Sequence, residues 1–139
     1  MMRQSIETLS VATSGRTLVE ITRDVAAWVE GTGIATGLLT VFCRHTSASL
    51  TIQENAAQEV RGDIVRWLDR IAPEDGGWMH DDEGPDDMPA HLKSVLTGVS
   101  LAIPVSNGRP ALGTWQGIYL IEHRSRPHRR EVVLHLIGE

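Results

Sequence analysis

The sequence that decides the fold class is LLTVFCRHTSASLTIQENAAQEVRGDIVRWLDRI, residues 38–71, because it contains two strands and a helix in close succession. The apolar run 38–43 predicts a buried strand, and residues 50–53 predict another after a short polar turn. Over residues 56–71 the apolar side chains recur every three or four positions, which predicts an amphipathic helix. Strands joined by so few residues pair antiparallel. We therefore expect an α+β protein rather than a fold built from parallel strands and crossover helices.

The rest of the chain continues the same pattern, and its 139 residues suit one domain, residues 1–139. Two further helices are expected at residues 23–30 and 88–97. The expected helix N-caps are Thr22, Asn55 and Asp87, since their short polar side chains can bond free backbone N–H groups. The strand that contains 38–43 is expected to begin at residue 34, and further strands are expected at residues 4–13, 17–21, 100–105, 112–122 and 131–137, the last buried on both faces. The sequence predicts a single domain, mainly antiparallel, with two or three helices.

Composition excludes several classes of partner. The formal net charge of −5 argues against binding nucleic acid or an anionic membrane over the whole surface. No apolar run approaches the length of a membrane span, and no signal peptide is evident. Cys43 is the only cysteine and lies in an apolar run, so we interpret it as a core residue. We expect a cytoplasmic protein with no nucleic-acid or membrane partner.

Three of the six histidines occur in places where a metal site can form. His45 follows a buried strand, His80 lies in an acidic loop, and His91 lies near the start of the next helix. If the three converged, they would leave an open position for water or substrate on a zinc-like metal. Their spacing matches no compact zinc motif, so the residues alone leave open whether they converge.

The acidic loop, residues 74–87, has two interpretations. Its carboxylates could bind a hard cation, although the EF-hand pattern is absent. The alternative is a flexible, solvated loop. The carboxylates in question are Asp81, Asp82, Asp86 and Asp87.

The segment 113–124 combines glycines with Trp115, Gln116 and an acid in an otherwise apolar strand. Glycine at positions 113 and 117 lets another backbone or a ligand come close. Glu122 needs a partner, which could be a metal-binding histidine or an arginine. The alternative is a sheet that packs against a neighbouring subunit.

Four motifs together resemble the YjbQ family, also called the secondary thiamine-phosphate synthase family. The resemblance implies an α+β homotrimer with a cleft near the subunit interface that often holds a metal. It also implies a weak thiamine-phosphate synthase activity, which joins a pyrimidine pyrophosphate to a thiazole phosphate and releases pyrophosphate. The motifs are His45-Thr46-Ser47-Ala48-Ser49-Leu50 with Glu54-Asn55, Asp87-Met88-Pro89-Ala90-His91-Leu92-Lys93, Ile103-Pro104-Val105 with Asn107-Gly108, and Gly113-Thr114-Trp115-Gln116-Gly117-Ile118-Tyr119-Leu120 with Glu122.

The resemblance places site residues at His45, His80, His91, Asn107, Gln116 and Glu122. We expect the three histidines to hold a divalent metal, zinc or magnesium. Catalytic roles are expected for Glu122, Gln116 and Asn107, with Glu122 either a general base or a group that orients a ligand. Arg44, Lys93 and Arg124 are expected to neutralise phosphate oxygens of a small phosphorylated substrate. The alternatives are another metal-dependent hydrolase or lyase, and a non-catalytic small-molecule-binding trimer.

Overall fold

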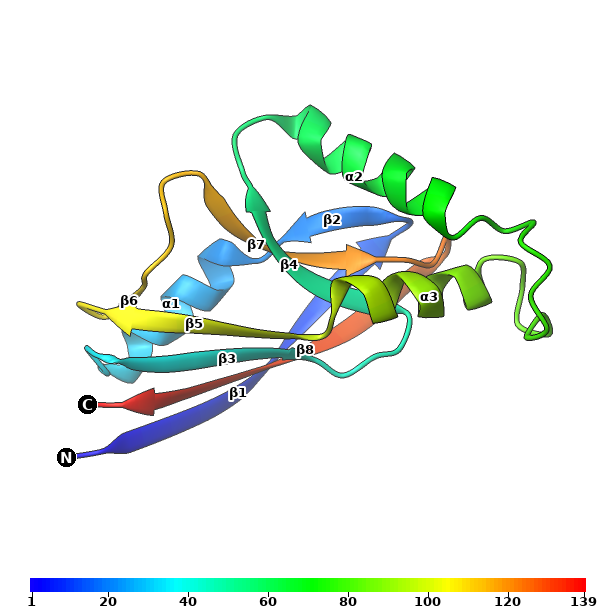
Figure 1. Cartoon of the computed structure of the whole chain (residues 1–139). Helices are drawn as coiled ribbons and strands as arrows, with labels where there is room; N and C mark the ends of the chain where they lie inside the picture. Colours follow the sequence, from blue (N-terminus) through cyan, green and yellow to red (C-terminus); the bar gives the residue numbers. More distant parts are fainter.

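The computed structural model describes all residues 1–139 and shows eight strands and three helices (Figure 1). The helices are α1 (Thr22–Thr32), α2 (Gln58–Ile71) and α3 (Asp87–Thr97). The strands are β1 (Arg3–Ser14), β2 (Thr17–Glu20), β3 (Gly37–Cys43), β4 (Ala48–Glu54), β5 (Ser100–Ser106), β6 (Arg109–Pro110), β7 (Gln116–Glu122) and β8 (Pro127–Gly138). The element order agrees with the prediction, apart from the added two-residue strand β6. None of the helices is long and apolar enough to span a membrane.

Two antiparallel sheets form the framework. The larger sheet has the order β1-β8-β3-β5-β6, and the smaller has the order β2-β7-β4. Every strand pair is antiparallel, including the long β1–β8 pair, which runs from Arg3 opposite Gly138 to Ser14 opposite Pro127. The predicted fold class, a single mainly antiparallel α+β domain, is therefore confirmed.

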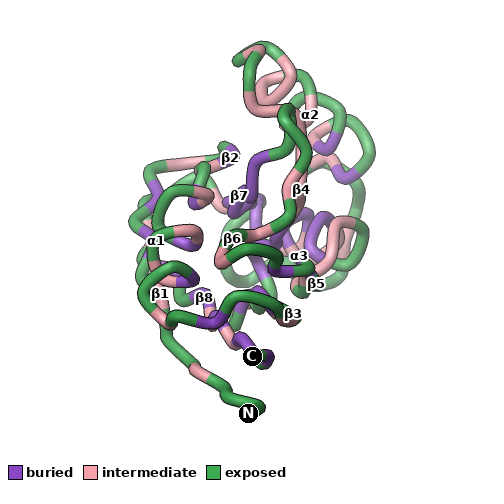
Figure 2. Tube along the Cα trace, turned by 90° about the vertical axis from the view of Figure 1, so that its left-hand side faces the viewer, coloured by how far each residue is buried: buried purple, intermediate pink, exposed green.

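Strand β7 lies between two hydrophobic cores, because alternate side chains of a strand point to opposite faces. Ile118 and Leu120 belong to the main core, which also includes residues of both sheets and of α1. Tyr119 and Ile121 belong to a second core with Leu68 of α2. The trace of β7 is accordingly buried along most of its length (Figure 2). Its C-terminal end thus delivers polar residues into the interior, beside the start of α3.

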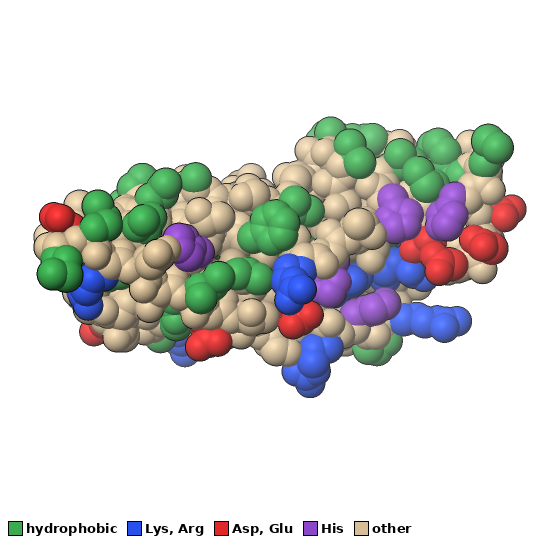
Figure 3. Space-filling model, turned by 90° about the horizontal axis from the view of Figure 1, so that it is seen from below, with side chains coloured by type: hydrophobic (Ala, Val, Ile, Leu, Met, Phe, Trp, Pro, Cys, Tyr) green, Lys and Arg blue, Asp and Glu red, His purple; other side chains and the backbone are tan.

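The outer face of the larger sheet has no covering element. On β8, Leu134 and Leu136 face the core, whereas Ile137 remains 39% exposed. Neighbouring strands add Ile6 and Leu38, 70% and 47% exposed. Seen from below, hydrophobic side chains are interspersed along the exposed surface (Figure 3). The prediction that residues 131–137 are buried on both faces is wrong for a single chain, because only one face of this sheet meets a core.

The helix N-caps expected at Thr22 and Asn55 are also wrong. The Thr22 hydroxyl accepts the N–H of Ile118 at 2.8 Å, so it ties α1 to β7 instead of capping its own helix. At α2 the N-cap position is Ala57, and its N–H donates to the carboxylate of Glu54 at 2.9 Å. The Thr22 hydroxyl is therefore used by a neighbouring strand, and at the start of α2 the acceptor is Glu54 instead of Asn55.

Strand β7 is shorter at its start than predicted. It begins at Gln116 rather than at residue 112. The side-chain carbonyl of Gln116 accepts the N–H of Gly113 at 2.8 Å, and its own N–H donates back to the Gly113 carbonyl at 3.1 Å. These bonds close a turn before the strand.

Candidate metal centre

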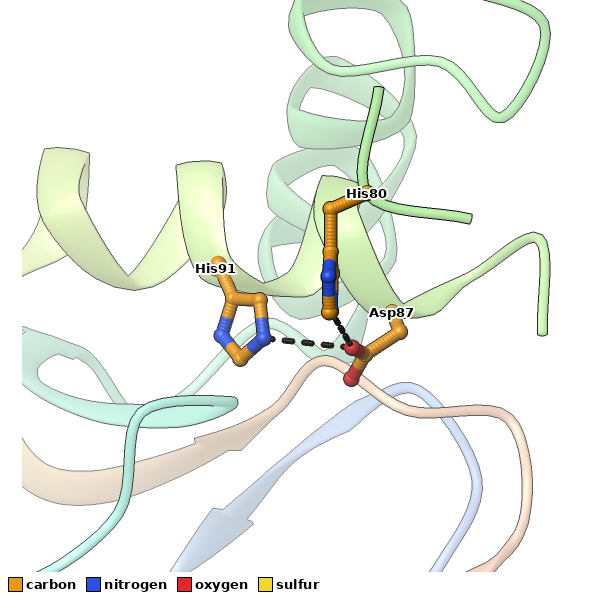
Figure 4. A group of neighbouring side chains, drawn as sticks. All are labelled: His80, Asp87 and His91. Carbon is orange, nitrogen blue, oxygen red and sulfur yellow. Dashed lines mark hydrogen bonds and ion pairs between the residues drawn. The ribbon is translucent and has the colours of Figure 1, made fainter. Parts of the chain in front are cut away.

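His80, Asp87 and His91 form the one group in the molecule whose atoms could hold a metal ion (Figure 4). His80 comes from the loop before α3, Asp87 is the first residue of α3, and His91 lies one turn later. Residues four apart in a helix share a face. One potential ligand atom from each side chain lies within 4.8 Å of the others. At this end of the molecule histidines gather beside acidic side chains (Figure 3).

The group is organised around one oxygen of Asp87. Its Oδ2 lies 2.7 Å from His80 Nε2 and 3.2 Å from His91 Nε2. The hydrogen bond to Asp87 raises the pKa of His80. Burial opposes ionisation of Asp87, but the bond with His80 and the nearby charges hold its pKa below the usual value. Asp87 was expected to cap the helix, and it makes no such bond.

A backbone carbonyl defines which ring nitrogen of His91 carries a hydrogen. Its Nδ1 lies 2.8 Å from the backbone carbonyl of Thr46, which can only accept a hydrogen bond, so Nδ1 carries the proton. With the proton on Nδ1, Nε2 is the nitrogen of His91 that faces the Asp87 carboxylate and can coordinate a metal ion. A proton on Nε2 makes the 3.2 Å contact with Asp87 an ion pair, and a metal ion beside the two atoms would make both of them ligands. This is the donor set that a metal ion fits.

Arg124 holds the second oxygen of Asp87. Its Nη1 donates to Asp87 Oδ1 at 2.7 Å, while Nε donates to Asp86 at 3.0 Å. Its Nη2 donates to the backbone carbonyl of Glu83 at 2.9 Å. Although burial opposes it, this pairing lowers the pKa of Asp86 to about 2. The guanidinium expected to bind substrate phosphate is thus engaged with the acidic loop.

His45 does not join the group. Its Nε2 accepts the backbone N–H of Glu131 at 2.8 Å, so that nitrogen is already used. Burial, the largest cause, lowers the pKa of His45, which keeps it neutral. The structure brings His80 and His91 together, as predicted, but replaces the expected third histidine by Asp87.

His45 and His91 instead share the lining of a cleft of about 730 Å³. The cleft lies between the segment after β3 and the side of α3. Arg44 also lines it, with a half-exposed side chain 3.8 Å from Glu131. The other residues that line the cleft are apolar or small: Phe42, Cys43, Thr46, Ser94, Val95, Gly98 and Val99. An apolar cleft with a few polar groups is the usual form of a small-molecule site.

Glu122 lies at the end of β7 and is fully enclosed. One oxygen accepts from Thr13 Oγ1 at 2.6 Å and from Arg130 Nε at 2.8 Å. The other accepts from Arg130 Nη2 and from the backbone N–H of Arg124 at 3.1 Å. Burial opposes ionisation, yet these bonds lower the pKa of Glu122. Of its two expected roles, this geometry favours orienting a neighbour over acting as a general base, because neither oxygen is free.

The other predicted site residues lie elsewhere in the single chain. Lys93 is buried and bonds Asp69 at 2.6 Å. Gln116 begins β7, about 20 Å along the strand from its Glu122 end. Asn107 occupies the turn between β5 and β6, which Figure 1 shows at the opposite end of the molecule from the start of α3. The structure does not bring these three to the histidines.

The acidic loop contributes little beyond Asp87. Asp82 and Glu83 are exposed, with carboxylate oxygens 3.6 and 3.5 Å from ring nitrogens of His80. Asp86 is occupied by Arg124 and by the backbone N–H of Ser125 at 2.9 Å. Of the four carboxylates considered for a hard cation, only Asp87 belongs to the candidate centre.

From the sequence, Asp87 was expected to cap the helix and was one of four carboxylates considered for a hard cation, but it was not grouped with the histidines. The signal that could have assigned it is its spacing to His91, since positions four apart on a helix place a carboxylate and an imidazole side by side. The role of the Thr46 carbonyl had no such signal, because it depends on a contact 45 residues apart in sequence. Of the two partners expected for Glu122, a histidine or an arginine, the structure shows an arginine, Arg130.

The fold and the candidate centre define a single-domain α+β protein with a His–Asp–His group at the start of a helix. The chain belongs to the YjbQ family: the profile described as UPF0047 protein YjbQ-like matches residues 7–139. A UPF0047 protein of Synechocystis sp. is 52% identical over 138 residues, covering 99% of this chain and 94% of that protein. The YjbQ protein of Salmonella typhimurium is 49% identical over 106 residues, covering 76% of this chain and 77% of that protein.

Solved structures agree with this assignment. A YjbQ/UPF0047 protein of Clostridium acetobutylicum has 37% identity and a TM-score of 0.86, covering 94% of this chain and 98% of that one. A protein of Sulfolobus solfataricus, described as YbjQ-like and of unknown function, has 27% identity and a TM-score of 0.93 over the full length of both chains. The resemblance noted in the sequence is confirmed.

Proposed function

We propose that this protein is a metal-dependent enzyme that acts on a small phosphorylated substrate in the cleft beside His91. The observation that carries the proposal is the approach of His80 Nε2 and His91 Nε2 to one oxygen of Asp87, at 2.7 and 3.2 Å, while the other ring nitrogen of His91 bonds the Thr46 carbonyl. Two imidazole nitrogens and one carboxylate suit zinc better than magnesium, which prefers oxygen ligands. Three protein ligands also leave a coordination position open for substrate.

The cleft supports a substrate with an apolar ring and an anionic group. Phe42, Val95 and Val99 offer an apolar surface, and Arg44 offers a cation at the edge. A bound divalent ion would neutralise charge on phosphate oxygens. The reaction we propose, on the family resemblance, is thiamine-phosphate synthesis from a pyrimidine pyrophosphate and a thiazole phosphate, with loss of pyrophosphate.

The test combines metal analysis with a turnover assay on the two thiamine precursors. We expect the purified protein to bind zinc in a 1:1 ratio and to form thiamine phosphate. Replacing His91 by Ala should abolish both, because it removes a ligand. Arg126→Gln is the control, since Arg126 is exposed and lies outside the candidate centre.

Each contrary outcome has a distinct meaning. Zinc binding without product would contradict the synthase reaction and favour a metal-dependent hydrolase or lyase. Equal binding and turnover by the His91 variant would contradict the assignment of the centre itself. Ligand binding by metal-free protein, with no turnover of any phosphorylated substrate, would favour a non-catalytic small-molecule-binding protein.

We also propose that the protein assembles as a homotrimer. The support is the uncovered face of the larger sheet, where Ile6, Leu38 and Phe42 remain 70%, 47% and 43% exposed. Exposed apolar side chains on an uncovered sheet face are consistent with an interaction surface. The number of subunits in this proposal is taken from the family resemblance.

A further inference from the structure

We infer that Arg124 is the positioning residue of the metal centre, and that it restricts Asp87 to coordination through Oδ2 alone. The inference rests on the proposed metal site and extends it to a residue outside the ligand set. Arg124 Nη1 occupies Asp87 Oδ1 at 2.7 Å, on the side of the carboxylate away from the histidines. Oδ2 is left as the oxygen that faces His80 and His91.

The guanidinium is held by more than one partner, so its direction is defined. Besides Asp87, it contacts the carboxylate of Asp86 through Nε and the carbonyl of Glu83 through Nη2. These contacts cross from the segment after β7 to the loop and first turn of α3. The side chains of Asp87 and Arg124 are 3% and 18% exposed, so solvent competes little for these bonds.

The backbone that carries Arg124 is fixed in turn. Its N–H donates to the enclosed carboxylate of Glu122 at 3.1 Å. Glu122 is itself held by Arg130 and Thr13. A chain of buried polar contacts therefore connects β1, β7 and β8 to the orientation of one potential ligand.

Lysine at position 124 cannot reproduce this geometry. A guanidinium presents several donors in a rigid plane, whereas an ammonium is a single point charge on a flexible stem. With lysine, one carboxylate of the Asp86–Asp87 pair would lose its partner, and Asp87 would be free to rotate or to chelate through both oxygens. Loss of such an orienting contact typically weakens metal binding about 10–100-fold.

Cobalt(II) is the probe for the test, because its visible absorption reports ligand geometry as well as binding. We expect Arg124→Lys to weaken Co²⁺ binding by about 10–100-fold and to change the absorption spectrum of the bound ion. Arg126→Gln is the matched control: Arg126 is exposed two residues away, and its variant should bind like wild type. Asp86→Asn, which keeps Arg124 but weakens its anchor, should shift binding in the same direction by a smaller factor.

Two failures are distinguishable. If wild-type protein binds no Co²⁺ or Zn²⁺, the proposed metal site is wrong. If wild type binds the ion and both Arg124→Lys and Asp86→Asn match it in affinity and spectrum, the site stands and the positioning role of Arg124 is overturned. Thermal unfolding of each metal-free variant, compared with wild type, establishes that the proteins measured are folded.

Discussion

His123 is a histidine that the folded protein keeps neutral. Its ring is buried, with Nε2 2.8 Å from the Ser49 hydroxyl, and burial with the nearby Lys93 charge lowers its pKa from 6.5 to about 3. Between these two values the unfolded chain binds a proton that the folded chain does not. This contribution to stability is therefore present above pH 6.5 and is lost progressively as pH falls toward 3.

Over this pH range His123 should make the free energy of unfolding fall by up to about 1.4 kcal/mol for each unit by which the pH is lowered. We expect His123→Gln to remove this dependence on pH. The measurement is urea unfolding of metal-free protein between about pH 5 and about pH 6.5, a range above the usual titration of Glu and Asp. Arg126→Gln, at an exposed position, serves as control. Slopes that are the same in wild type and the His123 variant would contradict the prediction.

At the candidate centre, sequence could predict residues that lie close along the chain. His80 and His91 flank the start of one helix, so their meeting needs only a short loop to turn back. The position of His45 was not predictable in this way. Whether its ring is free depends on the backbone N–H of Glu131, 86 residues further along the chain. Such a partner is set by strand register in the folded sheet, which local patterns do not specify.

At the scale of elements, the Glu122–Arg130 pair joins the end of β7 to β8 inside the protein. Glu122→Gln would leave the buried Arg130 guanidinium without its counter-charge. We expect this change to lower the free energy of unfolding by about 3–5 kcal/mol, measured by urea unfolding at neutral pH. Glu131→Gln, at an exposed position, should cost under about 1 kcal/mol. Equal costs for the two variants would show that the pair contributes no more than a surface charge.

The type of each element was predictable from hydrophobic period, whereas its ends were not. The apolar side chains that recur over residues 56–71 lie on one side of helix α2, and packing that side against a sheet stabilises the helix. The starts of the helices were harder to predict, because distant groups in the fold compete with the helix N–H groups for the same polar side chains. Thr22 bonds β7 and Asp87 bonds His80, since these tertiary partners replace the local N–H groups that a cap would satisfy.

For the whole molecule, the uncovered sheet face makes the oligomeric state testable. Leu38 on β3 lies opposite Ile137 on β8, and both are exposed in the single chain. Leu38→Lys places a charge on this face at little cost to the isolated subunit, but burying that charge between subunits would be strongly unfavourable. We expect light scattering to give wild type three times the chain mass of 15.3 kDa and the variant a single chain mass. Met79→Lys, at a 98% exposed loop position away from the sheet, should remain trimeric. A wild-type monomer would contradict the proposed assembly. A Leu38→Lys variant that stays trimeric would show that the subunit interface does not include this sheet face.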